Sequence, residues 1–150
     1  MRVVIQRVNR ASVSIQNKII SEISSGLVIL LGVEVDDTEG DCLWLASKIS
    51  SLRIFSDGDG RMNNSILDVD GEVIVVSQFT LHANVKKGNR PSYIKAARKE
   101  QAIPLYEKFK EDLSDLISKE VFSGDFGADM QVSLVNDGPV TIVIDTKNKQ

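Results

Sequence analysis

The sequence predicts an α+β protein: a single compact domain in which helices flank a curved, mostly antiparallel, barrel-like sheet. Strand patterns occupy both ends of the chain, and helical patterns lie in the middle. Short polar turns join consecutive strands near the N-terminus. A chain of 150 residues has the usual size of one domain, and no repeat or low-complexity segment divides it. We therefore expect one domain over residues 1–150, with a polar tail at 147–150.

The N-terminal segment is predicted to form strands that pair antiparallel, because tight turns separate them. A turn is expected at Gln16–Lys18 and a second one at Ser24–Gly26. The predicted strands are Arg2–Val8, Ala11–Ile15, Ile19–Ile23 and Leu27–Glu34.

A first helix should begin near Asp37–Glu39, where cap residues and acidic side chains stand together. Its inward stripe would be Leu43, Trp44, Ala46, Ile49 and Leu52. The remaining elements expected are a loop at Ser56–Asn64, a strand at Glu72–Leu81, helices at Ser92–Arg98 and Ala102–Lys119, and strands at Gln131–Val135 and Val140–Asp145 around a turn at Asn136–Pro139.

Composition narrows the classes of function. A hydrophobic share of 42% and a charged share of 26% are those of an ordinary soluble protein. The net charge of −3 argues against a protein that coats nucleic acid non-specifically. No apolar run approaches the roughly 20 residues that span a bilayer, and the N-terminus lacks the features of a signal peptide. We expect a cytoplasmic protein with neither membrane nor DNA as a partner.

The lone cysteine agrees with a reducing compartment. Cys42 has no second cysteine with which to form an internal disulfide, and it lies in an apolar helical stretch. A buried structural thiol is the favoured interpretation.

Metal and cofactor motifs fail at particular residues. The segment Asp57–Arg61 resembles a calcium loop, but Arg61 and Met62 stand where a ligand and a glycine are needed. One histidine and one cysteine cannot make a structural zinc site, and there is no P-loop or dinucleotide fingerprint. We expect no cofactor and no metal.

Thr80 and His82 are the candidates for nucleophilic catalysis. On a strand, residues two apart face the same side, with Cα atoms roughly 6–7 Å apart. His82 is the sole imidazole of the chain. The residues alone leave two interpretations open: a catalytic pair, or a histidine at a surface strand end.

Two further segments carry polar groups where strands end. Ser77–Leu81 closes an apolar strand, and such polar ends often face a cleft or a partner. Asn136–Thr141 contains Pro139, which cannot donate to a strand ladder and so belongs at an edge or turn. On physics alone, each segment is a strand end that could belong to a site.

Together these segments resemble a known family. Ser77-Gln78-Phe79-Thr80-Leu81 paired with Asn136-x-Gly138-Pro139-x-Thr141 is similar to the double signature of the D-aminoacyl-tRNA (D-Tyr-tRNA) deacylases. The resemblance covers essentially the whole chain, including the opening eight residues, Ala11–Val13 and the segment 88–92.

The resemblance implies a homodimer whose active sites lie at the subunit interface. Ser77, Gln78, Phe79 and Thr80 of one subunit would act on the substrate. The partner would contribute a cis Gly138–Pro139 dipeptide as a chiral gate. The gate segment would comprise Asn136, Gly138, Pro139 and Thr141, with Arg7 holding the dipeptide in orientation.

The implied reaction is hydrolysis of the ester of D-aminoacyl-tRNA as a proofreading step, with glycyl-tRNA as a secondary substrate. Main-chain amides around Gln78–Thr80 would stabilise the oxyanion. Either Thr80 attacks, or a ribose hydroxyl of the tRNA assists a water; the second is favoured because Thr80 lacks a base and an orienting group.

A basic cluster follows the active-site segment. Six cations fall within residues 86–99. Lys86, Lys87 and Arg90 are predicted to bind tRNA phosphates. Two alternative functions stay open: a small esterase or peptidase that uses Thr80 and His82, and a non-catalytic dimeric RNA-binding module.

Overall fold

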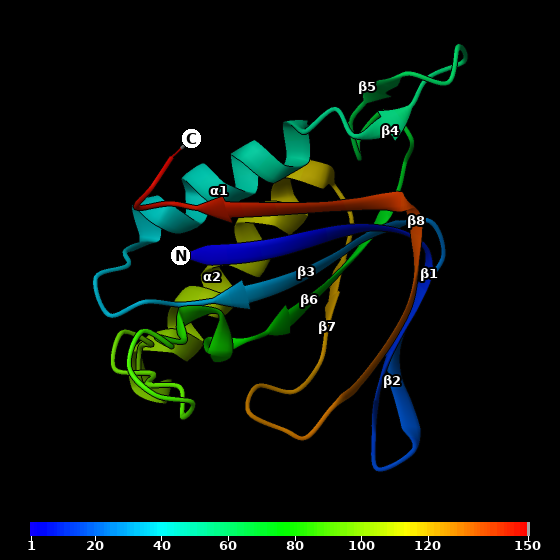
Figure 1. The fold of residues 1–150 in the computed structure, drawn as a ribbon. Helices are drawn as coiled ribbons and strands as arrows, with labels where there is room; N and C mark the ends of the chain where they lie inside the picture. The colour runs from blue at the N-terminus through cyan, green and yellow to red at the C-terminus, as the bar shows by residue number, and fades with distance from the viewer. Residues whose placement is uncertain (150) are drawn as a thin grey trace.

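A curved sheet of six strands forms the centre of the molecule, and two helices pack on one of its faces (Figure 1). The computed structural model describes residues 1–149. The sheet consists of β1 (Arg2–Ile15), β2 (Lys18–Ile23), β3 (Gly26–Gly32), β6 (Glu72–Ser77), β7 (Val121–Ser123) and β8 (Gln131–Asp145). The other elements are α1 (Glu39–Ser51), the hairpin β4 (Phe55–Ser56) and β5 (Met62–Asn64), the 3₁₀ turn η1 (Phe79–His82) and α2 (Lys99–Ile117).

β1 is one long strand rather than the two that were predicted. Along one edge it pairs antiparallel with β3 and then with β2, and along the other with β8. Val8 pairs with Gly26 and Ala11 with Ile23, so the register is the same in β3 and β2. The predicted turn at Ser24–Gly26 is therefore wrong: Ser24 and Ser25 only interrupt a second long strand, because the β1 ladder continues on both sides of them.

The sheet closes toward a barrel through two parallel pairings. β3 pairs with β6, and β6 pairs with β7, both parallel. The Ser21 hydroxyl on β2 then donates to the Ser123 carbonyl on β7 at 2.5 Å. The predicted barrel-like α+β class is confirmed, and the antiparallel pairings of β1 account for most of the ladder. β7 was not predicted, because three residues are too few to show a period of two.

α1 begins as predicted. Thr38 is its N-cap, and Asp41 completes a capping box by accepting from the Thr38 amide at 2.9 Å. Leu43 was expected to face inward but is 55% exposed. Cys42 takes the inward position instead, with its thiol buried and donating to the Leu105 carbonyl at 3.3 Å. The burial of the free thiol agrees with a structural cysteine, and the same burial raises its pKa to about 12.

The predicted helix at Ser92–Arg98 is wrong. The chain turns at Ile94 and Lys95 and then forms an isolated bridge between Ala96 and Glu34, next to the end of β3. The Ala97 amide donates to the Val33 carbonyl at 2.9 Å. The Val35 amide likewise donates to the Lys95 carbonyl at 3.1 Å. Tertiary pairing thus overrides the helical composition of this segment. α2 begins at Lys99, three residues earlier than predicted.

β8 continues through the predicted turn. Asn136 pairs with Val8, and Thr141 pairs with Gln6, with a register shift between them. The Gly138–Pro139 bond is cis, as the resemblance implied, and Gly138 has a φ of 124°. The predicted loop at 56–64 contains the β4–β5 hairpin. Among the described residues, neither helix combines the length and apolar character that a bilayer crossing requires.

Candidate active site

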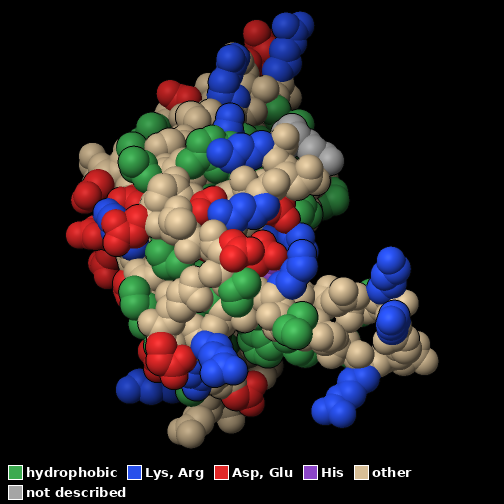
Figure 2. Space-filling view, turned by 90° about the vertical axis from the view of Figure 1, so that its left-hand side faces the viewer, with side chains coloured by type: hydrophobic (Ala, Val, Ile, Leu, Met, Phe, Trp, Pro, Cys, Tyr) green, Lys and Arg blue, Asp and Glu red, His purple; other side chains and the backbone are tan. Residues whose placement is uncertain are grey.

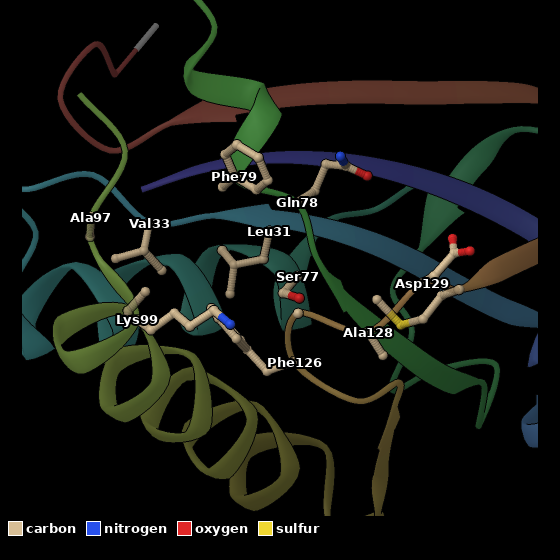
Figure 3. A pocket seen from close by; sticks show the side chains of 13 residues that line it. Leu31, Val33, Ser77, Gln78, Phe79, Ala97, Lys99, Phe126, Ala128 and Asp129 are labelled. Carbon is tan, nitrogen blue, oxygen red and sulfur yellow. The ribbon is translucent and has the colours of Figure 1, made fainter. Parts of the chain in front are cut away.

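A pocket of about 430 Å³ opens where β6 ends, opposite the first turn of α2 (Figure 3). Ser77, Gln78 and Phe79 form one wall, and Lys99 lies across from them. Apolar groups line much of the remainder: Leu31, Val33, Ala97, Ala102, Phe126 and Met130. Three of the four predicted catalytic residues therefore border one cavity.

The predicted strand does not extend to Leu81. β6 stops at Ser77, and Phe79–His82 forms a 3₁₀ turn. The Gln78 amide donates to the Leu31 carbonyl at 2.8 Å, so it is engaged in the fold. The Phe79 and Thr80 amides have no acceptor within residues 1–149. Two unengaged N–H groups beside a pocket are suited to an oxyanion.

Thr80 and His82 do not form a catalytic pair. In a 3₁₀ turn, residues two apart point in different directions, unlike those on a strand. The Thr80 hydroxyl is hydrogen bonded to the side-chain amide of Gln78. The His82 ring is buried against Gly32, and its Nε2 atom has no partner among the described residues. The geometry removes the basis for a hydrolase built on these two side chains.

Arg2 anchors the 3₁₀ turn, a role that sequence reasoning missed. Its Nη1 donates to the Leu81 carbonyl at 2.7 Å. Its Nε and Nη2 donate to the Asp145 carboxylate at 3.0 and 2.7 Å. Burial acts to raise the pKa of Asp145, but the hydrogen bonds from Arg2 and from the Lys147 amide, together with the nearby positive charges, outweigh it and the pKa is lowered. Arg2 thereby ties η1 to the end of β8.

The Gly138–Pro139 dipeptide lies midway along β8, away from η1. It sits beside Arg7 of β1, whereas η1 contacts Arg2, five residues and about 16 Å along the same strand. Gly138 and Pro139 are both exposed. One chain therefore does not bring its two signature segments together.

The gate segment is held by a buried arginine. Arg7 donates from Nε to the Asp137 carbonyl at 3.1 Å and from Nη1 to the Ile54 carbonyl at 2.6 Å. Asn136 braces the other side, accepting from the Val140 amide at 2.9 Å and donating to the Thr141 hydroxyl at 3.0 Å. Side-chain hydrogen bonds from Arg7 and Asn136 thus hold the chain on both sides of the Gly138–Pro139 dipeptide.

The predicted tRNA-binding residues occupy an exposed loop. Lys86, Lys87 and Arg90 lie between Asn84 and Ser92, which form an isolated antiparallel bridge. Figure 2 shows basic side chains on a lobe that stands out from the body of the molecule. At the base of the loop, the rings of Tyr93 and Phe79 pack edge to face, with centroids 5.0 Å apart.

Comparisons with known proteins show what the chain is similar to. Residues 4–145 match the family model described as D-Tyr-tRNA(Tyr) deacylase. A D-aminoacyl-tRNA deacylase of Bacteroides fragilis is 61% identical, and one of Flavobacterium psychrophilum is 59% identical, each over the full length of both chains.

Two solved structures share the fold. The c-Myc DNA unwinding element binding protein is 41% identical, with a TM-score of 0.90 over 97% of this chain and 98% of its own. A "probable eukaryotic D-amino acid tRNA deacylase" has a TM-score of 0.80 over 95% and 97% at 17% identity, which supports the fold alone.

The fold, the pocket and these relatives define a class of protein: an enzyme, and specifically a hydrolase of aminoacyl-tRNA esters. Within that class, the chain belongs to the D-Tyr-tRNA(Tyr) deacylase family. The resemblance carried by the two signature segments is thereby confirmed.

Proposed function

We propose that this protein hydrolyses the ester bond of D-aminoacyl-tRNA and releases a free D-amino acid and tRNA in the cytoplasm. The observation that carries the proposal is the pocket bordered by the 3₁₀ turn, where the Phe79 and Thr80 amides are unengaged, in a chain of this family. Water would add to the ester carbonyl, and the 3′ oxygen of the terminal ribose would leave with a proton. The two amides would bind the oxyanion that develops in between.

The chiral gate is proposed to come from a second copy of the chain. Gly138 and Pro139 are exposed, and they lie too far from the pocket of their own chain to contribute to it. A wall of main-chain atoms can reject an L side chain by steric clash without reading the D side chain. This arrangement permits many D substrates and gives glycine, which has no side chain to reject, partial access.

The direct test compares amino-acid release from D-tyrosyl-, L-tyrosyl- and glycyl-tRNA. We expect rapid hydrolysis of the D ester, slower hydrolysis of the glycyl ester, and little hydrolysis of the L ester. Equal rates on the D and L esters would contradict the gate. Binding without release would indicate a non-catalytic RNA-binding module, and cleavage of a small ester without tRNA would indicate a general esterase.

The side chain of Thr80 is proposed to be a positioning group and not the nucleophile. Its hydroxyl is hydrogen bonded to the Gln78 amide side chain, and His82 is buried away from it. Thr80→Val should therefore lower kcat on D-tyrosyl-tRNA by no more than about tenfold, the scale of one lost neutral hydrogen bond. A loss of several orders of magnitude in single-turnover rate, with substrate binding intact, would restore the threonine as the attacking group.

Lys86, Lys87 and Arg90 are proposed to contact phosphates of the acceptor end. Replacing both lysines by glutamate should raise KM for D-tyrosyl-tRNA and flatten its dependence on salt, because each phosphate contact contributes to that slope. The measurement is kcat/KM across a series of potassium chloride concentrations. A slope equal to that of the wild type would exclude these two side chains from the tRNA interface.

A further inference from the structure

Two aromatic rings stand exposed beside the candidate active site. Phe79, the first residue of η1, borders the pocket, and Figure 3 shows its ring at the edge of the cavity. The ring of Tyr93 packs edge to face on Phe79, with centroids 5.0 Å apart, but Tyr93 is not one of the residues that line the pocket. Exposed fractions of 55% for Phe79 and 37% for Tyr93 leave part of each side chain open to a ligand. Tyr93 therefore lies just outside the pocket, one ring beyond Phe79.

The position of Tyr93 is fixed by the neck of the basic loop. Asn84 and Ser92 exchange two main-chain hydrogen bonds, at 2.8 and 3.0 Å, and Ser92 immediately precedes Tyr93. On the other side, the Tyr93 carbonyl accepts from the Ala96 amide at 3.0 Å. A ring held in such a frame loses little conformational freedom when a ligand packs on it. The segment 88–92, which contributes to the resemblance to the family, thus ends at the residue that closes the loop next to the ring.

The surroundings of Tyr93 suit a single-stranded nucleic acid. Three exposed cations stand on the loop itself, namely Lys86, Lys87 and Arg90. Single-stranded RNA is typically bound by cations that contact its phosphates and by aromatic side chains on which its bases stack. The 3′ end of a tRNA is single-stranded, so its phosphates match the cations and its unpaired bases match the ring.

We propose that Tyr93 binds the single-stranded 3′ end of the tRNA by stacking on the base of the penultimate nucleotide, a cytosine. The inference rests on the proposed function, which brings the ester of the terminal nucleotide to the Phe79 and Thr80 amides. The nucleotide before it then leaves the pocket past Phe79 and meets the next exposed ring, which is that of Tyr93. The cations of the loop bind the phosphates that follow.

The test compares kcat/KM on three D-tyrosyl esters: those of adenosine, of cytidylyl-adenosine and of whole tRNA. In the wild type, the added cytidine should raise kcat/KM by about fivefold or more, the scale of one base–aromatic stack. Tyr93→Leu keeps an apolar side chain without a π face. It should lose this gain and act as the wild type on the adenosine ester. Tyr93→Phe keeps the ring and should retain the gain.

The residue next to Tyr93 supplies a matched control. Ile94 is 84% exposed and offers apolar surface but no ring. Ile94→Ala should therefore retain the gain from the cytidine. An equal loss in Ile94→Ala and Tyr93→Leu would indicate a general apolar surface, as for a protein partner, and would overturn the stacking.

The outcomes separate this inference from the function on which it rests. If Tyr93→Leu lost activity equally on all three esters, with an unchanged unfolding temperature, the ring would only support Phe79 and the inference would be overturned. A gain that persists in Tyr93→Leu would overturn it as well, because the cytidine would then bind elsewhere. In both cases hydrolysis of D-tyrosyl-tRNA by the wild type would leave the deacylase proposal standing. A wild type that hydrolyses none of the three esters would overturn the function and the inference together.

Discussion

Gly138→Ala is expected to lower kcat/KM for D-tyrosyl-tRNA by about 100-fold, a loss that a 1 Å displacement of a positioning group can cause. The φ of Gly138 is 124°, a conformation that L side chains rarely adopt. An added Cβ would lie 3.0 Å from Nη2 of Arg7 and 3.0 Å from Cγ2 of Val140. Arg7 is buried and bonded on both sides, so the dipeptide itself must move. Steady-state hydrolysis, with thermal unfolding to confirm the fold, measures the effect.

Two controls test whether the loss of activity in Gly138→Ala comes from the dipeptide and whether the dipeptide acts on the partner's pocket. Gly58→Ala places a Cβ in open space on the β4–β5 hairpin and should behave as the wild type. If the gate of one subunit serves the pocket of the other, mixing Gly138→Ala with a variant whose pocket is blocked, Ala102→Trp, should restore part of the activity. A mixture as inactive as its components would contradict the shared site.

Asp37→Asn is expected to lower the unfolding temperature by about 10 °C. The Asp37 carboxylate is fully buried, where it is paired with the Met1 ammonium and accepts from the Glu34 amide at 2.6 Å. Removing one partner of a buried ion pair leaves the other charge uncompensated, at a cost of about 3–5 kcal/mol. For a chain of this size, each kcal/mol corresponds to about 2–4 °C. Thermal unfolding followed by circular dichroism gives the value.

The neighbouring residue supplies a matched control for this prediction. Asp36 is exposed, and Asp36→Asn makes the same chemical change outside the ion pair. It should shift the unfolding temperature by no more than about 2 °C, as is usual at the surface. Equal shifts in the two variants would contradict the prediction, because they would show that the buried ion pair adds nothing to the stability of the fold.

Local patterns predicted the fold where neighbours in sequence decide the structure. A turn was predicted at Gln16–Lys18 and a helix start near Asp37–Glu39; the structure has the turn at Gln16 and Asn17, and Thr38 caps α1. The other parts of the fold depend on hydrogen bonds between residues that are far apart in the sequence. Residues 95–97 bond to residues 33–35, which follow β3 and lie some sixty positions earlier in the chain, and the carbonyl of Leu81 accepts from Arg2. Neither contact leaves a periodic signal in the sequence.

Part of the candidate site could likewise be predicted from local sequence, and part of it could not. The two signature segments were recognisable because their residue types stand in a fixed order, and Ser77, Gln78 and Phe79 of the first segment line a pocket. The strand that was expected to continue to Leu81 is instead a 3₁₀ turn. Thr80 and His82 therefore do not face the same side, as two residues of one strand would. Lys99 was noted only as one of six cations. Its direction into the pocket depends on where α2 begins, which composition does not reveal.

Because β1 pairs with β8, the sheet cannot finish folding until the C-terminal strand has been synthesised. β1 reaches β2 through a two-residue turn, whereas its partners on β8 lie more than a hundred residues away. Closing so long a loop is slower than closing a hairpin, and an unpaired strand edge attracts other chains. On the ribosome, one edge of β1 therefore stays open until residues 131–145 emerge. The pocket wall at Ser77–Phe79 leaves the ribosome well before the gate segment and gains its Asp145–Arg2 anchor only when the last strand docks.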